Sequence, residues 1–336
     1  MQVGDMPNLE IVNSIVTRPL LEKMVLKEVG CFSSIFPPDH VLSCQSFVVQ
    51  PTKVTIDNCK THADYTDERR RYCTSTLPNI TTLCQLVDLS QLRHIIVKST
   101  VTLSKNLFPH HVAQALGSLE ILEVHNCNEV EILIEPAGDV QLPYFPNLQS
   151  LILTYLSNLS YIWKGTRELI NLSRLKYIRL YECDRLTSLF TSTLTKSLVK
   201  LEALQIMHCK ALETIIARDD KSCEASTGMQ DSFKEMEIIR VEFCDNLKSV
   251  LPISFVAHGL PKLKSFTIAY CDNLEQVFVD EEGIVAKTAK IEWKNLDSLV
   301  LWNLPKLVRF VPFNWHLKII SSLSQFAVSL KYQVRI

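Results

Sequence analysis

The sequence lacks the segments that mark a membrane or secreted protein. None of its stretches approaches the roughly 18 consecutive apolar residues that a membrane-spanning helix requires. The N-terminus, MQVGDMPNLE, has neither the basic n-region nor the apolar h-region of a signal peptide. We therefore expect a chain without a membrane span, located in the cytoplasm or the nucleus.

An excess of charge of one sign is also missing. The 35 basic residues are balanced by 36 acidic ones, and we find no run of five or more like charges. Nucleic-acid binders usually carry a basic patch that attracts the phosphate backbone. The short run Arg69 to Arg71 lies beside Asp64, Asp67 and Glu68, which is typical of a solvated loop. We expect no nucleic-acid partner.

The motifs that carry common catalytic chemistry are absent as well. The sequence contains no G-x-x-x-x-G-K-[ST], G-x-G-x-x-G, H-E-x-x-H or G-x-S-x-G, and no C-x-x-C. His208 precedes Cys209 and His125 lies near Cys127, but a nucleophile needs its base beside it and a third group to orient that base. We expect these imidazoles to face solvent and the thiols to face inward. The prediction is that the chain is not an enzyme and holds no cofactor or metal.

What the sequence does contain is a repeat. The pattern L-x-x-[LI]-x-[LI]-x-x-C-x-x-L-x-x-[LI] starts at Leu175 and again at Leu201. Strong copies start at Leu119, Leu148, Leu175, Leu201, Met236, Leu263 and Leu296, and weaker ones at Leu21, Pro51 and Leu92. The copies at Leu175 and Leu201 start 26 residues apart. Apolar columns that match at such a spacing are typical of a solenoid, in which each repeat buries its apolar face against its neighbours.

Within each copy, the alternation at the start of the pattern predicts one β-strand, and the residues after the Cys predict turns and short helices. We expect an α/β repeat solenoid with a concave parallel sheet of about ten strands and a convex side of loops and short helices. The predicted helices cover residues 110–116, 191–200 and 254–259. Residues 21–315 would form the solenoid, residues 1–20 a degenerate first repeat or a cut end, and residues 316–336 a C-terminal cap or a frayed tail.

Six cysteines share one column of the pattern: Cys59, Cys127, Cys183, Cys209, Cys244 and Cys271. Their spacings along the chain follow the spacings of the repeats, and zinc ligands are not spaced in this way. A small buried residue with a weak S–H donor suits a position that turns inward after the strand. We interpret the column as structural.

The same pattern assigns a binding surface. Positions 1, 4, 6 and 9 point into the core, whereas positions 3, 5, 7 and 8 face the concave side, where curved solenoids usually bind. Aromatic residues and Arg are common anchors of interfaces. The predicted contact residues are Tyr155, Arg179, Tyr181, Arg240, Phe243, Tyr270 and Trp302. The alternative is that these aromatic side chains only stabilise one another across the sheet.

Three phrases carry a family resemblance: FPNLQSLIL (145–153), LPKLKSFTIAYCDNLEQVF (260–278) and LDSLVLWNLPKLVRF (296–310). They resemble the leucine-rich repeats of plant disease-resistance proteins, in the coiled-coil class of nucleotide-binding receptors. The resemblance implies a leucine-rich-repeat horseshoe that recognises a pathogen effector, or a host protein that an effector modifies, and that holds a nucleotide-binding switch inactive. Neither a coiled coil nor a nucleotide-binding domain is present in this sequence. We therefore expect a protein partner: an effector, a guarded host protein or the nucleotide-binding domain of the same receptor.

Two other classes stay open. F-box ubiquitin-ligase adaptors carry Cys in the same column, but their repeats are more uniform and no F-box-like segment precedes this array. The ectodomain of a repeat receptor would explain the sequons at Asn79, Asn158 and Asn171, although the missing signal peptide and membrane span argue against it.

Overall fold

The computed structural model describes eleven segments of the chain, which are residues 2–3, 23–27, 53–57, 89–99, 105–134, 143–163, 170–217, 232–256, 260–280, 289–312 and 315–329. They fall into two compact units. Unit 1 comprises Met1–Leu148 and Lys164–Ile170, and unit 2 comprises Gln149–Trp163 and Asn171–Ile336.

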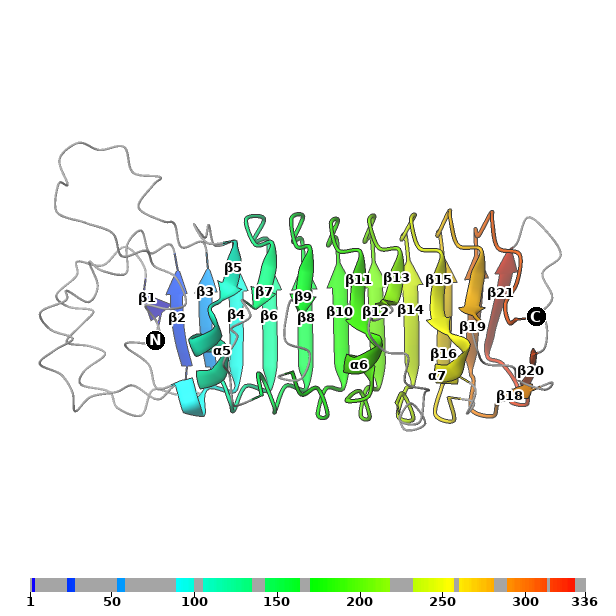
Figure 1. Ribbon diagram of the computed structural model, residues 1–336, viewed down its shortest axis with the longest axis horizontal. Helices are drawn as coiled ribbons and strands as arrows, with labels where there is room; N and C mark the ends of the chain where they lie inside the picture. Colours follow the sequence, from blue (N-terminus) through cyan, green and yellow to red (C-terminus); the bar gives the residue numbers. More distant parts are fainter. Residues whose placement is uncertain are drawn as a thin grey trace, which may run out of the picture. The chain divides into compact units, whose positions relative to one another are not determined.

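Seven parallel strands form the main sheet of unit 2 and lie side by side in Figure 1. They are β8 (Ser150–Thr154), β10 (Tyr177–Tyr181), β12 (Ala203–Met207), β14 (Ile238–Glu242), β16 (Ser265–Ala269), β19 (Ser298–Trp302) and β21 (Gln325–Ser329). Each residue pairs with the residue at the same pattern position of the next copy, as Arg179 does with Gln205. The first six strands are copies of the pattern, and β21 lies beyond them.

Unit 1 contributes five parallel strands of the same kind. They are β1 (Gln2–Val3), β2 (Lys23–Lys27), β3 (Lys53–Asp57), β4 (His94–Lys98) and β6 (Ile121–His125). The weak copies at Leu21, Pro51 and Leu92 thus form strands as the strong ones do. The prediction of one parallel strand per copy is confirmed for all ten copies.

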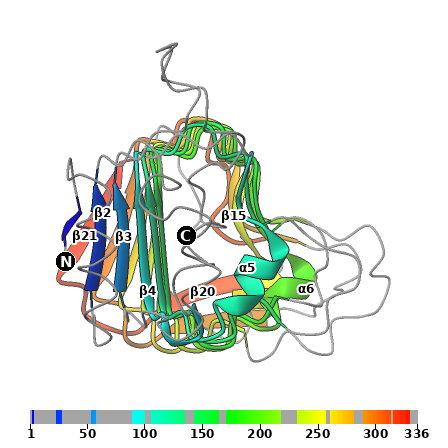
Figure 2. The ribbon, with the colours of Figure 1, turned by 90° about the vertical axis from the view of Figure 1, so that its left-hand side faces the viewer.

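A second, unpredicted set of strands lies on the other side of several repeats. In unit 2 they are β11 (Ser188–Thr191), β13 (Thr214–Ala217), β15 (Ser249–Pro252) and β17 (Gln276–Val279), which pair in parallel. Figure 2 shows β15 on the opposite side of unit 2 from the main-sheet strand β21. In unit 1, β5 (Asn106–Phe108) pairs with β7 (Ile132–Ile134). Each of these strands has only three or four residues, too few to show an alternating pattern.

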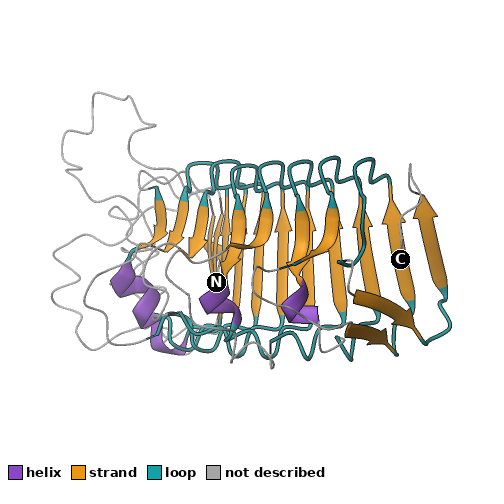
Figure 3. Cartoon of the chain, turned by 45° about the vertical axis from the view of Figure 1, so that its right-hand side comes forward, coloured by secondary structure: helices purple, strands orange, loops and turns teal. Residues whose placement is uncertain are grey.

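The helices are few and short in the described segments (Figure 3). Helix α5 (His110–Ala115) confirms the first prediction. Helices α6 (Ser192–Thr195) and α7 (Ile253–Val256) are shorter than, or shifted from, their predicted ranges, and residues 257–259 lie outside the described segments. In α6 the Thr195 hydroxyl donates to the Ser192 carbonyl at 2.6 Å. Such local bonds compete with helix propagation and explain why a Ser/Thr-rich segment forms a single turn.

The core consists of stacked columns. In the repeat that starts at Leu175, Leu175, Ile178, Leu180, Cys183 and Leu186 are all fully buried. Burying one such aliphatic side chain contributes about 1.5–3 kcal/mol, so the columns dominate the stability of the array. The assignment of positions 1, 4, 6 and 9 to the core is confirmed.

The C-terminal part of unit 2 adds an aromatic cluster to this core. One of its residues, Trp293, ends strand β18 (Ala289–Trp293), which pairs in parallel with β20 (Trp315–Ile319). Strand β9 (Tyr161–Trp163) lies earlier in unit 2. Phe266 contacts Trp293 with ring centroids 5.3 Å apart, and Phe278 meets Phe310 edge to face at 5.4 Å. All four rings are buried. Edge-to-face pairs of this kind add to the stabilisation that their buried area supplies.

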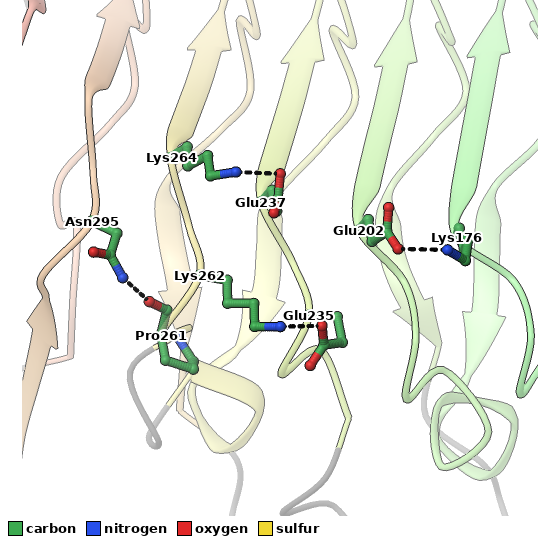
Figure 4. Close-up of polar contacts among 8 residues, drawn as sticks. All are labelled: Lys176, Glu202, Glu235, Glu237, Pro261, Lys262, Lys264 and Asn295. Atoms are coloured by element: carbon green, nitrogen blue, oxygen red, sulfur yellow. Dashed lines mark hydrogen bonds and ion pairs between the residues drawn. The ribbon is translucent and has the colours of Figure 1, made fainter.

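Ion pairs join equivalent positions of neighbouring repeats along the rim of unit 2 (Figure 4). Lys176 meets Glu202 at 3.1 Å, Lys264 meets Glu237 at 2.8 Å, and Lys262 pairs with Glu235. Exposed pairs contribute little to stability. In another order of repeats, like charges would meet at these positions and repel. The main effect of the ion pairs is therefore to favour the observed order.

Adjacent residues on β16 test the assignment of the two faces. We expect Ile268→Ala to lower the free energy of unfolding by about 2–5 kcal/mol, because Ile268 is fully buried and the substitution leaves a cavity. Thr267→Ala, on the opposite face of the strand, should change it by less than about 0.5 kcal/mol. Urea unfolding measures both, and equal losses would contradict the assignment.

Candidate functional site

In eight repeats, from the copy at Leu92 to the copy at Leu296, the residue that follows the main-sheet strand has a left-handed backbone. These residues, at position 8 of the pattern, have φ between 47° and 57°: Ser99, Asn126, Tyr155, Glu182, His208, Phe243, Tyr270 and Asn303. In seven of the eight the N–H group still donates to the neighbouring strand, as Tyr155 does to the Tyr181 carbonyl at 2.8 Å and Tyr270 to the Trp302 carbonyl at 2.9 Å. The chain therefore turns away from the sheet without losing the hydrogen-bond ladder.

Bulky side chains at this position are unfavourable for the backbone. The left-handed conformation costs most residues about 1–2 kcal/mol, and Gly and Asn adopt it most easily. Asn126 and Asn303 follow that preference, whereas Tyr155, Phe243 and Tyr270 do not. Unfavourable backbone conformations cluster at functional sites, so these three positions point to a role beyond folding.

The rings at the ends of the strands form one continuous row in unit 2. This aromatic ladder consists of Tyr155, Tyr181, His208, Phe243 and Tyr270. Tyr155 meets Tyr181 at 5.2 Å between ring centroids, and Tyr181 meets His208 at 5.1 Å. His208 and Phe243 stack at 4.4 Å, and Phe243 and Tyr270 at 4.5 Å with nearly parallel planes. The ladder thus crosses five successive repeats.

The seven predicted contact residues occupy positions 5, 7 and 8 of the repeats of unit 2. We call the side chains at positions 3, 5 and 7 of its main sheet the outer face; Tyr155, Phe243 and Tyr270, at position 8, lie at its edge, where the strands end. Tyr155, Tyr270 and Trp302 remain 44%, 38% and 44% exposed. Tyr181 and Phe243 are half-buried within the ladder. Four of the predicted residues, Tyr155, Tyr181, Phe243 and Tyr270, are brought into the ladder, whereas Trp302 has no ring contact among the described residues.

The two predicted arginines differ in their surroundings. Arg179 and Arg240 are both exposed on position 5. The Arg240 guanidinium donates to the Glu242 carboxylate at 2.8 Å. Within the described segments Arg179 has no ion pair.

Sequence reasoning did not select His208, although the ladder depends on it. His208 bridges Tyr181 and Phe243, which lie on strands that are not neighbours. The available signal was the column: four of the six position-8 residues of unit 2 carry a ring. The His208 ring stacks on Phe243, while the Cys209 thiol donates to the main-chain carbonyl of Met207 at 3.6 Å. The expectation that this His and Cys do not pair is confirmed.

Unit 1 carries a separate polar cluster on its own sheet. Glu123 accepts from His94 Nε2 at 2.8 Å and from His125 Nε2 at 3.2 Å. Burial lowers the pKa of His94. Burial alone would raise the pKa of Glu123, but the two imidazole hydrogen bonds outweigh it and the pKa falls below its ordinary value. The carboxylate is therefore charged and satisfied within the cluster.

The column of thiols is buried, as predicted. The described members, Cys127, Cys183, Cys209, Cys244 and Cys271, are free thiols with no exposed surface, and Cys59 lies outside the described segments. Cys244 and Cys271 each donate to the position-7 carbonyl of their own repeat at 3.4 Å. A hydrogen bond with Cys209 and burial raise the pKa of Cys183 well above its ordinary value. Burial raises the pKa of Cys271 to about 12, so this thiol is unsuited to nucleophilic chemistry.

The described segments contain no group of three or more His, Cys, Asp or Glu side chains that could hold a metal ion. No helix in these segments is both long enough and apolar enough to span a membrane.

A typical repeat consists of a parallel strand, a left-handed turn residue, an inward Cys or Leu and a return segment. This arrangement, repeated along the chain, defines a leucine-rich-repeat protein. Residues 74–210 and 216–327 match the family described as plant disease resistance protein RPS2-like, leucine-rich repeats. These matches cover more than half of the chain, which therefore belongs to that family. The family's repeats support a recognition role in plant defence. No curated protein matches the chain.

The pKa of Cys271 gives a test of the buried column. At pH 8 we expect its alkylation in the native chain to be about a thousandfold slower than in the unfolded chain, because the thiolate fraction falls tenfold for each unit above 9.0. Folding retains this proton, so the free energy of unfolding should fall as the pH rises from about 9 toward about 12. Mass spectrometry of the Cys271 peptide measures the rate, and equal rates in both states would exclude burial.

The left-handed turn gives a second test. Tyr270→Asn and Tyr270→Ala both remove the ring, but only Asn adopts positive φ easily, so the Asn variant should be more stable by about 1 kcal/mol. Urea unfolding measures the difference. Tyr161, exposed at the start of β9 without positive φ, is the matched control and should show no advantage for Asn.

Proposed function

We propose that this chain is a protein-recognition module of plant innate immunity. Its outer face binds a pathogen effector or a host protein that an effector modifies, or contacts the nucleotide-binding domain that such repeats regulate. It acts by binding and not by catalysis. The observation that carries the proposal is the aromatic ladder, four of whose five rings stand on left-handed positions and two of which, Tyr155 and Tyr270, remain exposed.

The composition of the face fits a protein partner. Tyr, Trp and Arg dominate the energetics of protein interfaces because they bury large areas and still form hydrogen bonds. Tyr155, Tyr270 and Trp302 are three of the seven large hydrophobic side chains that are exposed in the described segments. They gather along one end of the main-sheet strands, where a partner can cover them together.

The alternative, a purely structural ladder, explains less. A ring pair adds about 0.5–1.5 kcal/mol beyond its buried area. The left-handed position costs about 1–2 kcal/mol for each residue that is neither Gly nor Asn. The two terms nearly cancel, so the rings at Tyr155, Phe243 and Tyr270 add little net stability over Asn. Retaining them is better explained by contact with a partner.

The proposal is tested by a double substitution, Tyr270→Asn with Trp302→Thr. Asn suits the left-handed turn and Thr suits a strand, so the circular dichroism spectrum should not change. The chain is used as bait in extracts of healthy and pathogen-challenged plant tissue, and the captured proteins are then purified and titrated. We expect the variant to weaken binding by at least about a hundredfold, since two central anchors are lost.

Val308→Thr is the matched control, because Val308 is 62% exposed but lies outside the outer face. It should bind as the wild type does. A partner that binds the wild type, the control and the double variant equally would refute the proposed surface.

A further inference from the structure

The outer face of unit 2 has an unusual charge pattern. Its position-3 row is Ser150, Tyr177, Ala203, Ile238, Ser265, Ser298 and Gln325; its position-5 row is Ile152, Arg179, Gln205, Arg240, Thr267, Val300 and Ala327; and its position-7 row is Thr154, Tyr181, Met207, Glu242, Ala269, Trp302 and Ser329. These three rows contain two arginines and one carboxylate.

The one carboxylate is already engaged. Glu242 lies 2.8 Å from the Arg240 guanidinium, and its side chain is only 15% exposed. Arg179 lies two strands away from Glu242, which is about 10 Å across the sheet. Glu182 lies beyond the end of strand β10, at the left-handed turn and outside these three rows, and interacts with the Tyr181 hydroxyl. Arg179 is thus an exposed cation without a counter-charge on its face.

The neighbours of Arg179 add hydrogen-bond donors. Gln205 is its cross-strand partner on β12. The Tyr177 hydroxyl donates to Gln205 Oε1 at 3.1 Å, which satisfies the acceptor of that amide. The Gln205 N–H₂ group is left to donate, next to the five donors of a guanidinium. Together they suit a planar acceptor with two oxygens.

The ladder has the same electrostatic preference. His208, Phe243 and Tyr270 stack nearly parallel, so Phe243 is covered on both faces and offers a partner mainly its edge. Ring edges carry the positive part of the aromatic quadrupole, which attracts carbonyl and carboxylate oxygens. The member of the ladder on strand β10 is Tyr181, two residues and about 7 Å along the strand from Arg179.

We propose that Arg179 and Gln205 bind the carboxylate of an Asp or Glu side chain on the protein partner. An apolar side chain of the same partner segment packs against the ladder about 7 Å away, which is the separation of residues i and i+2 in an extended chain. The recognised feature is an acidic residue beside an apolar one on a protein surface. This inference rests on the proposed function, because it takes the outer face as the binding surface.

The test uses the full chain and a phage-displayed library of random peptides as the probe. We expect the wild type to select peptides in which Asp or Glu is enriched over the starting library. The selected peptides should bind Arg179→Gln at least about tenfold more weakly, because an uncompensated carboxylate is then left at the interface. Arg179→Glu should select Lys or Arg in place of the acid. Higher salt should weaken binding to the wild type more than to Arg179→Gln.

Arg174→Gln is the matched control, since Arg174 is exposed just before strand β10 and lies outside the outer face. It should bind the peptides as the wild type does. Two results would overturn this inference and leave the proposed function standing: peptides that depend on Tyr270 and Trp302 show no acidic enrichment, or they bind Arg179→Gln as tightly as the wild type. Selection of no peptides, or of peptides that ignore Tyr270 and Trp302, would count against the proposed function and this inference together.

Discussion

One hydrogen bond, repeated from copy to copy, is the constraint on which the rest of the structure depends. At the end of the main-sheet strands of unit 2 from β8 to β19, the amide of a left-handed residue donates to the last carbonyl of the next strand, as His208 does to the Glu242 carbonyl at 2.9 Å. The main-chain ladder therefore extends one residue beyond the strand while the chain already turns. Without positive φ at this point, either the turn or the hydrogen bond would be lost, and a buried amide without a partner is costly.

The same turn separates the two kinds of chemistry in the repeat. The left-handed residue projects outward, and the residue after it points into the core, where a thiol donates to the carbonyl at the end of its own strand. Burial raises the pKa of Cys271 to about 12 and so keeps this thiol protonated. The side chains open to selection for binding are those at the strand ends and on the outer face, because changing them leaves the core columns intact.

Stability and recognition make opposite demands on position 8. Asn would suit the backbone there, as Asn126 and Asn303 illustrate, whereas the ladder places rings at the position. Each ring recovers part of the conformational cost by stacking on its neighbours, and a bound partner would recover more. Much of the charge of unit 2 lies elsewhere, in ion pairs between neighbouring repeats just before the main-sheet strands, such as Lys176–Glu202 and Lys264–Glu237. The outer face itself carries little charge. A lone cation such as Arg179 is conspicuous against that background.

The sequence by itself determined the columns. Apolar columns that recur from copy to copy, with an alternation of two along each strand, identify the strands, the buried Leu and Cys positions and the side chains that share the outer face, since each depends only on position within a repeat. Only the tertiary structure decided which neighbours meet. The short second strands such as β13, the place of His208 between Tyr181 and Phe243, and the pairing of Arg240 but not Arg179 all depend on lateral contacts between repeats. Those contacts join residues about one period apart in the chain, and their geometry follows from twist, side-chain rotamers and local charge, which no single repeat encodes.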